Sequence, residues 1–263
     1  MMASVGPASD TAVAGLPLSN CKLCLSDRPL VKSHIIPEPF WKLLKSEGET
    51  PLLHSTIPGD HAKRAPIGVY DKGILCQSCD GRLGVWDDYG HKTLLRDFDE
   101  VCVYEGKRLA GIFDNIDYKK LKLFFLSILW RASVGSQAFF NRVELGEHQN
   151  RLYEMIRSED PGDPDEFAVN LLKLEGGQSR IILSPARTCI ENVNYFKLYM
   201  GGYVAHIKVD KRPTGKRLRE VALQPDGALY VILQDLRESG EFEVMKRIVI
   251  ISAEKKRKNS LSE

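Results

Sequence analysis

The chain has 263 residues, of which 43% are hydrophobic and 27% charged, and its formal net charge is +2. This length accommodates one large domain or two to three small ones, and the composition is ordinary for a globular protein. No apolar stretch reaches the roughly 18 residues that a membrane span needs, so we expect no membrane association. The small net charge excludes a strong global field, and any nucleic-acid surface must come from local clustering.

Residues 1–18 mix Ala, Gly, Ser, Pro and Thr without apolar periodicity, and we predict that they form a flexible tail. No basic residue precedes their short apolar run, so a secretory signal is not expected. The chain has six cysteines, and four of them lie in two close pairs. This usage fits a reducing compartment better than a disulfide framework, and we therefore expect a cytoplasmic protein.

The two cysteine pairs predict a structural zinc site. Cys21 and Cys24 form one Cys-x-x-Cys pair, and Cys76 and Cys79 form the other. Thiolates at this spacing can chelate one ion, and two pairs complete the tetrahedral sulfur shell that Zn²⁺ prefers. Closing the loop between the pairs costs about 3 to 4 kcal/mol. Structural zinc binding contributes about 10 to 16 kcal/mol in small modules, so the ion outweighs this cost.

The second cysteine pair lies at a plausible helix start. Asp80 would occupy the first turn, where the exposed backbone N–H groups favour a carboxylate. At helical spacing Asp80, Gly84, Asp87 and His91 share one face, and Leu83 marks a different, apolar face. The two internal glycines weaken this helix, so its length is left open.

Three segments together resemble a known family: Cys21-x-x-Cys24, Ser33-His34-Ile35-Ile36-Pro37, and Leu75-Cys76-x-x-Cys79-Asp80. They resemble the zinc-bearing variant of the HNH endonuclease superfamily over about residues 19 to 92. The resemblance implies a ββα-metal (treble-clef-like) core, in which zinc joins the base of a hairpin to a helix. It also implies a separate catalytic metal ion between hairpin and helix.

The resemblance also implies roles for individual residues. His34 is at the position of the general base, and Asp80 is at the position of the last ligand of the catalytic metal. Asp71 is at the position of the middle Asn, and Ser33 precedes the base where the family has a metal ligand. The implied activity is hydrolysis of nucleic-acid phosphodiester bonds with Mg²⁺ or Mn²⁺. An imidazole titrating near pH 6.5 suits a general base, and a carboxylate suits these hard cations.

The departures from the family pattern leave alternatives open. The neutral hydroxyl of Ser33 binds such ions weakly, and an ionised Asp71 accepts hydrogen bonds but donates none. His34 could instead be a structural histidine, or it could join the zinc shell in place of a cysteine. The rival function is a non-catalytic zinc-folded module that binds nucleic acid or protein. We expect DNA rather than RNA as the partner, and a protein partner or a homo-oligomer stays an alternative.

A helical region is predicted over residues 106–175. Within it, residues 118–133 have an apolar stripe at helical spacing and no Gly or Pro, so we expect a central helix there. Arg131 near its end is expected to be buried with a carboxylate partner. A second helix is predicted over residues 147–157, with its apolar stripe at Leu152, Met155 and Ile156.

A small antiparallel sheet is predicted over residues 176–254. A half-buried strand is expected at 203–209, and further strands are expected at 229–233 and 245–251 with a hairpin turn at 238–241. The cations between Lys208 and Arg219 form either a phosphate-contacting hairpin loop or a solvated surface. Residues 255–263 are predicted to be a basic tail. The expected fold is therefore α+β, with the zinc-stabilised module over residues 19–105.

Overall fold

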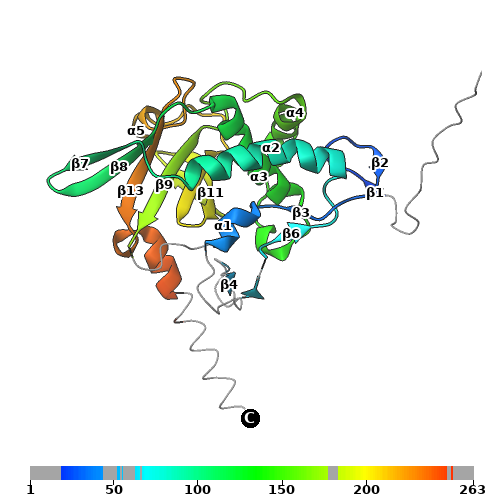
Figure 1. Cartoon of the computed structure of the whole chain (residues 1–263), viewed down its shortest axis with the longest axis horizontal. Coiled ribbons are helices and arrows are strands. Elements are labelled where there is room, and N and C mark those ends of the chain that lie inside the picture. The colour runs from blue at the N-terminus through cyan, green and yellow to red at the C-terminus, as the bar shows by residue number, and fades with distance from the viewer. Residues whose placement is uncertain are drawn as a thin grey trace, which may run out of the picture.

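The computed structural model describes residues 19–43, 52–53, 55, 63–65, 67–176, 183–247 and 250. The predicted tails over residues 1–18 and 255–263 lie outside this described part of the chain. The four-cysteine end and the large sheet occupy opposite sides of the molecule, and two long helices lie between them (Figure 1). Among the described residues, no helix combines the length and apolarity that crossing a bilayer requires.

The N-terminal part carries short strands in two-residue ladders and one long helix. The long helix, α2 (Gln77–Leu94), begins at Cys76 and ends before Leu95. The shorter elements are β1 (Ser19–Asn20), β2 (Asp27–Arg28), β3 (Ser33–His34), α1 (Glu38–Lys42), β4 (Leu52–Leu53), β5 (Lys63–Arg64) and β6 (Tyr70–Asp71). The ladders pair β1 with β2, β3 with β6, and β4 with β5, each antiparallel.

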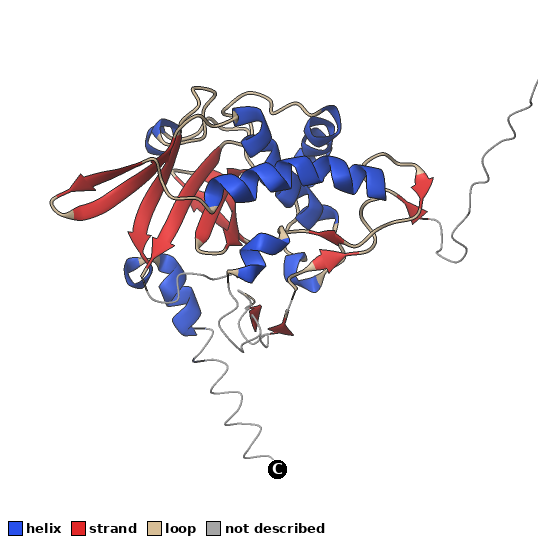
Figure 2. Ribbon diagram, viewed as in Figure 1, coloured by secondary structure: helices blue, strands red, loops and turns tan. Residues whose placement is uncertain are grey.

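A helical layer follows along the chain, and it contains both predicted helices. The central one is α3 (Tyr118–Val134), whose N-cap Asp117 accepts a hydrogen bond from the Lys120 N–H at 3.0 Å. The other is α4 (Gln149–Ser158), which buries its predicted stripe of Leu152, Met155 and Ile156. Short 3₁₀ turns, η1 (Ala138–Phe140) and η2 (Gly146–His148), connect them. Helix α3 contacts the sheet at β12 and also contacts α4, and Figure 2 shows this helical layer beside the sheet.

The sheet has seven strands among the described residues, in the order β10-β11-β12-β9-β13-β8-β7. Its strands are β7 (Glu100–Tyr104), β8 (Lys107–Phe113), β9 (Val169–Glu175), β10 (Ala186–Ile190), β11 (Val193–Met200), β12 (Tyr203–Lys208) and β13 (Leu229–Asp235). All neighbours are antiparallel except β13 and β9, which are parallel. The sheet is therefore larger than predicted and mixed, and the expected helical region over residues 106–175 also supplies β8 and β9.

Strand β12 differs from its half-buried prediction, because both of its faces are covered. In a half-buried strand Val204 and Lys208, which alternate with Tyr203, Ala205 and Ile207, would face solvent, but they are 0% and 2% exposed. One face belongs to the main core with α3, whereas Val204 packs in a second cluster with Tyr199 and Leu236 on the other face. An alternating pattern in the sequence does not reveal such two-sided coverage.

The strand predicted at 245–251 is wrong for its described part, and so is the hairpin turn at 238–241. The 3₁₀ turn η3 (Leu236–Glu238) leads into a helix over residues 240–247. Phe242 and Met245, spaced by one helical turn, pack on the second cluster. A short apolar run fits a strand or a helix equally well, and the contact with the sheet decides between them.

One hydrophobic cluster joins the two sides of the molecule. It runs from Cys21 and Leu23 at the cysteine end, through all of α3, to Val231 and Leu233 in the sheet. Helix α3 is buried on every side, as expected for an element that packs against α2, α4 and β12 together. The position of the cysteine module relative to the sheet therefore depends on α3.

Candidate metal centre and the adjacent ribbon

The four predicted zinc ligands come from two tight backbone turns. Cys21 and Cys24 lie in the turn between β1 and β2, where the Cys21 N–H donates to the Ser26 carbonyl at 3.0 Å and the Leu25 N–H donates to the Cys21 carbonyl at 2.8 Å. Leu25 has a φ of 61°, the left-handed conformation that closes this turn. Cys76 caps α2, and Cys79 lies in its first turn.

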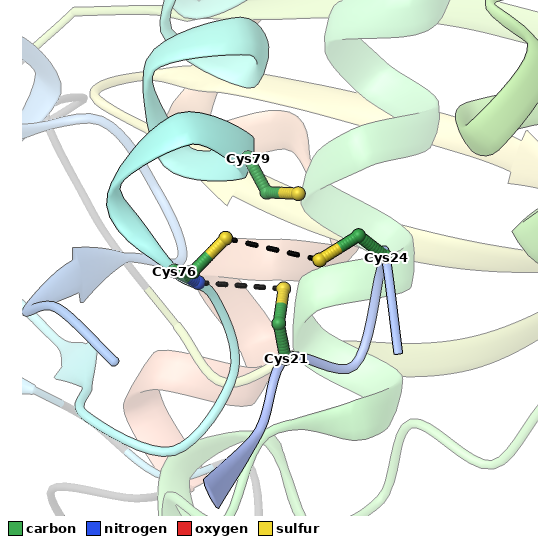
Figure 3. Close-up of side chains that lie close together, drawn as sticks. All are labelled: Cys21, Cys24, Cys76 and Cys79. Carbon is green, nitrogen blue, oxygen red and sulfur yellow. Dashed lines mark hydrogen bonds between the residues drawn. The ribbon is translucent and has the colours of Figure 1, made fainter. Parts of the chain in front are cut away.

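These turns bring all four sulfur atoms together. One ligand atom from each of Cys21, Cys24, Cys76 and Cys79 lies within 4.8 Å of the others. Figure 3 shows the four thiols pointing toward a common centre, and the Cys76 N–H donates to the Cys21 sulfur at 3.3 Å. Cys24 is the exposed member, and the other three are buried. Four thiols in this arrangement match the donor set of a closed structural zinc site.

The acidities of the thiols are consistent with metal binding. Burial opposes ionisation of Cys76, but hydrogen bonds from Ser78 and from the Cys79 backbone outweigh it and lower the pKa of Cys76 to about 6. Burial and the neighbouring thiols raise the pKa of Cys79. Several thiolates repel one another when no cation lies between them, and a bound divalent ion removes this repulsion.

Beside the cysteines, the β3–β6 ribbon lies next to the first turn of α2. Ser33 pairs with Asp71, and His34 pairs with Tyr70. Residues opposite each other in an antiparallel ladder share a face, and neighbours along a strand face opposite ways. Accordingly, Ser33 and Asp71 are 1% and 3% exposed, whereas His34 and Tyr70 are half-buried on the other face.

Ser33 contacts Asp80 directly. Its hydroxyl donates to Asp80 Oδ1 at 2.6 Å, joining the strand to the first turn of α2. Asp80 was predicted in that turn, and the structure places it there, half-buried. The structure therefore brings the side chain of Ser33, rather than that of His34, against the Asp80 carboxylate.

The His34 ring is oriented by the backbone. Its Nε2 lies 2.9 Å from the Ile67 carbonyl oxygen. A carbonyl only accepts hydrogen bonds, so Nε2 carries the proton and Nδ1 keeps the basic lone pair. The ring meets Tyr70 edge-on with centroids 6.0 Å apart, and the Lys32 ammonium lies 4.0 Å from the Tyr70 ring centroid. None of these contacts involves the cysteine cluster, whose four candidate ligand atoms are all sulfur.

Asp71 braces a loop instead of pointing to an open site. Its carboxylate accepts from the Gly73 N–H at 2.7 Å and from the Ser136 N–H and hydroxyl at 2.6 and 2.9 Å. Burial opposes ionisation of Asp71, but these hydrogen bonds outweigh it and lower the pKa of this carboxyl. Asp71 thus ties β6 to the loop that follows α3. Ser136 carries no sequence motif, so its role could not be read from the chain.

Arg131 is buried and has the carboxylate partner that its sequence position predicts. Its two terminal nitrogens donate to Asp87 at 2.6 and 2.8 Å, and one of them also donates to the His34 carbonyl at 2.7 Å. Burial raises the pKa of Asp87, and the guanidinium opposes that shift. On the face of α2 that was predicted to hold Asp80, Asp87 and His91, Asp87 therefore forms an ion pair with Arg131. The His91 ring hydrogen-bonds the Asp87 carbonyl within the helix.

The predicted catalytic residues do not form a multidentate metal cluster of their own. In the described part of the chain, the four cysteines are the one group of three or more Cys, His, Asp or Glu side chains close enough to share an ion. Asp71 is occupied by its loop contacts, which leaves Asp80 as the carboxylate beside the ribbon.

The basic stretch between Lys208 and Arg219 is not a hairpin loop. It is a loop followed by the short helix α5 (Lys216–Glu220). Lys208 is 2% exposed and pairs with Asp165 at 2.6 Å, and Arg212 pairs with Asp210. Lys211 pairs with Glu147. These carboxylates neutralise much of the charge that would attract a phosphate.

No family model matches the chain, and comparisons with curated proteins and with solved structures return no match.

Proposed function

We propose that the chain is a zinc-stabilised endonuclease that hydrolyses nucleic-acid phosphodiester bonds, with DNA as the preferred substrate. The observation that carries the proposal is the 2.6 Å hydrogen bond between Ser33 and Asp80. In the HNH superfamily that the sequence resembles, these two positions hold the catalytic metal. Their direct contact supports a ligand site between the ribbon and the start of α2.

The chemistry assigns a separate task to each side chain. Asp80, with Ser33 beside it, would hold Mg²⁺ or Mn²⁺, which stabilises charge on the phosphodiester and on the leaving 3′ oxygen. His34 would accept a proton from the attacking water at Nδ1, because Nε2 is engaged by the Ile67 carbonyl. Zinc on the four cysteines would keep the first turn of α2, and hence Asp80, beside β3.

Basic and aromatic groups around His34 suit a nucleic-acid backbone. Lys32 and Tyr70 lie on the His34 face of the ribbon. An ammonium group there can contact a phosphate, and a tyrosine ring offers a surface for a base. The local charge is modest, so few phosphate contacts are expected and the binding affinity should fall only gently with salt.

Cleavage of plasmid DNA and of RNA with Mg²⁺ or Mn²⁺ tests the proposal. We expect wild-type protein to nick or cut DNA, and His34→Ala and Asp80→Asn each to lose at least about 100-fold in rate. His148→Ala, which removes a histidine from η2, is the matched control and should cut normally. Equal cleavage by wild type and His34→Ala would trace the activity to a contaminant and remove the assignment.

A non-catalytic nucleic-acid-binding module is the second candidate. It is favoured by the engagement of Asp71 in its loop and by the opposite facing of His34 and Ser33 on the ribbon. Such a module would bind DNA in a gel-shift assay and cut nothing with any divalent ion. Lys32→Glu would then weaken binding, whereas His34→Ala and Asp80→Asn would leave DNA intact as the wild type does.

A further inference from the structure

The β7–β8 hairpin projects from the edge of the large sheet. Figure 1 shows it extending beyond the rest of the molecule. Strand β13 pairs with β8 only from Ala110 to Phe113, so the outer part of the hairpin is a two-stranded ribbon. Every residue from 102 to 109 is exposed. A two-stranded ribbon without a covered face is marginally stable in water, so this segment gains from a partner.

The exposed ribbon carries large apolar side chains on the outermost strand. Val103 and Tyr104 in β7 are 59% and 64% exposed, and Leu109 in β8 is 48% exposed. The extra residue of the bulge near Cys102 lies in β8, so β7 itself runs without interruption. Strand β7 contains no Pro, Lys or Arg, the residues that commonly protect an edge from pairing.

We infer that β7 is a dimerisation edge, which pairs in antiparallel fashion with β7 of a second copy of this chain. An edge strand leaves alternate backbone N–H and C=O groups without a ladder partner. A second copy presents the same groups and the same apolar side chains, and a two-fold axis allows each edge to satisfy the other. The two seven-stranded sheets then continue into one another across the axis.

Charge and side-chain pattern favour a register centred on Cys102. In that register Val101 lies opposite Val103 of the partner copy, twice per dimer, and Cys102 lies opposite its own copy. Glu100 of one copy lies opposite Tyr104 of the other copy. Within that other copy, Tyr104 pairs with Lys107 across the hairpin. The Tyr104 side chain therefore lies between Glu100 of one copy and Lys107 of the other, on the same face of the sheet. Opposite charges and β-branched pairs stabilise antiparallel ladders.

Sedimentation velocity of the full-length, zinc-loaded protein from about 1 to about 100 µM tests this interface. We expect a reversible dimer, and Val103→Lys should raise its Kd at least about 10-fold because each lysine faces the apolar Val101 of the partner. Val85→Lys on α2 replaces a valine of similar exposure, 57%, and should leave the Kd unchanged. A monomer throughout this range, or equal effects of the two variants, would overturn the inference.

Cross-linking with a short bismaleimide tests the register. Wild-type protein should give a covalent dimer, and Cys102→Ser should abolish it. Cys189→Ser removes the exposed cysteine of β10, at the opposite edge of the sheet, and should cross-link as the wild type does. Cross-linking that depends on Cys189 instead would assign the interface to β10 and refute the role of β7.

Discussion

The buried guanidinium of Arg131 connects three elements of the chain. It lies on α3, pairs with Asp87 of α2 and donates to the His34 carbonyl of β3. The Arg131 side chain is 2% exposed and that of Asp87 is 17% exposed. Such a pair adds little net stability over apolar residues, but it makes the loss of one partner costly because the other charge stays buried. Its orientation also holds the backbone beside the proposed base.

Arg131→Met should therefore destabilise the protein by about 3 to 5 kcal/mol, because it leaves the Asp87 carboxylate without its partner. The double variant Arg131→Met/Asp87→Leu should be markedly more stable than Arg131→Met alone. Urea unfolding of the wild type, both single variants and the double variant measures this coupling. If the loss of stability in the double variant equals the sum of the losses in the two single variants, the two side chains act independently.

A second single residue, Lys122, is expected to make the folding stability depend on pH. It is 1% exposed, and its ammonium donates to the Asp163 carbonyl at 2.6 Å and to the Tyr118 hydroxyl at 3.0 Å. Burial lowers the pKa of Lys122 to about 8, against the opposing charges of nearby carboxylates. At pH values between this lowered pKa and the ordinary pKa of lysine, Lys122 is protonated in the unfolded chain and mostly neutral in the folded one. Raising the pH through this window therefore increases the free energy of unfolding.

We expect this gain to reach at most about 3 kcal/mol between pH 8 and pH 10. Lys122→Met should lack the gain, so that its stability relative to the wild type falls as the pH rises through this window. Guanidinium unfolding of both proteins at a series of pH values provides the measurement. Parallel pH profiles would mean that Lys122 titrates normally in the folded chain.

Two glycines of α2 have opposite surroundings within one helix. A Cβ at Gly90 would lie 2.3 Å from the Phe124 ring of α3, whereas a Cβ at Gly84 would meet nothing within 4 Å. Gly90 therefore permits the close approach of α2 and α3, which holds α2 on the core. Gly84 serves no such contact and only weakens the helix.

Gly84→Ala should stabilise the protein by about 0.5 to 1 kcal/mol through helix propensity. Gly90→Ala should destabilise it by about 1 to 3 kcal/mol, because the Phe124 ring must move within a packed core. Thermal unfolding of the wild type and the two variants compares the same substitution at two positions of one helix. A stabilising Gly90→Ala would mean that α2 and α3 are not packed at this contact.

At the scale of the whole molecule, the main hydrophobic cluster is continuous from the cysteine end to the sheet. Helix α3 belongs to both sides, and α2 begins at the proposed zinc site. Cooperative unfolding follows when packed units share their core. Loss of the metal is therefore expected to affect the sheet as well as the cysteine turns.

We expect about one zinc ion per chain in protein purified without chelator. Removing it should lower the melting temperature of the entire chain in a single transition seen alike by tryptophan fluorescence and far-ultraviolet circular dichroism. Cys79→Ser should reproduce this loss, and Cys102→Ser, which changes a cysteine outside the cluster, should retain the metal. Metal-free protein with unchanged melting, or two separate transitions, would contradict this expectation.

Local pattern was sufficient for several features of this protein. The Cys-x-x-Cys spacing predicted which four residues form the sulfur cluster, because chelation by each pair is a short-range property. Apolar periodicity predicted α3 and α4, and the position of Asp80 in the first turn of α2 followed from the second cysteine pair. The mixed seven-stranded sheet was not accessible in this way, since its parallel β9–β13 pairing joins segments far apart in the chain.

The sequence by itself determined which residues can bind zinc and where the central helices lie, since both depend on neighbours within a few positions. Only the tertiary structure decided that Ser33 hydrogen-bonds Asp80 and that Ser136 hydrogen-bonds Asp71. It also decided that residues 240–247 form a helix that packs against the sheet. Those outcomes depend on which distant groups share a face or a hydrogen bond once the chain is packed. A linear pattern does not encode such contacts in any single segment.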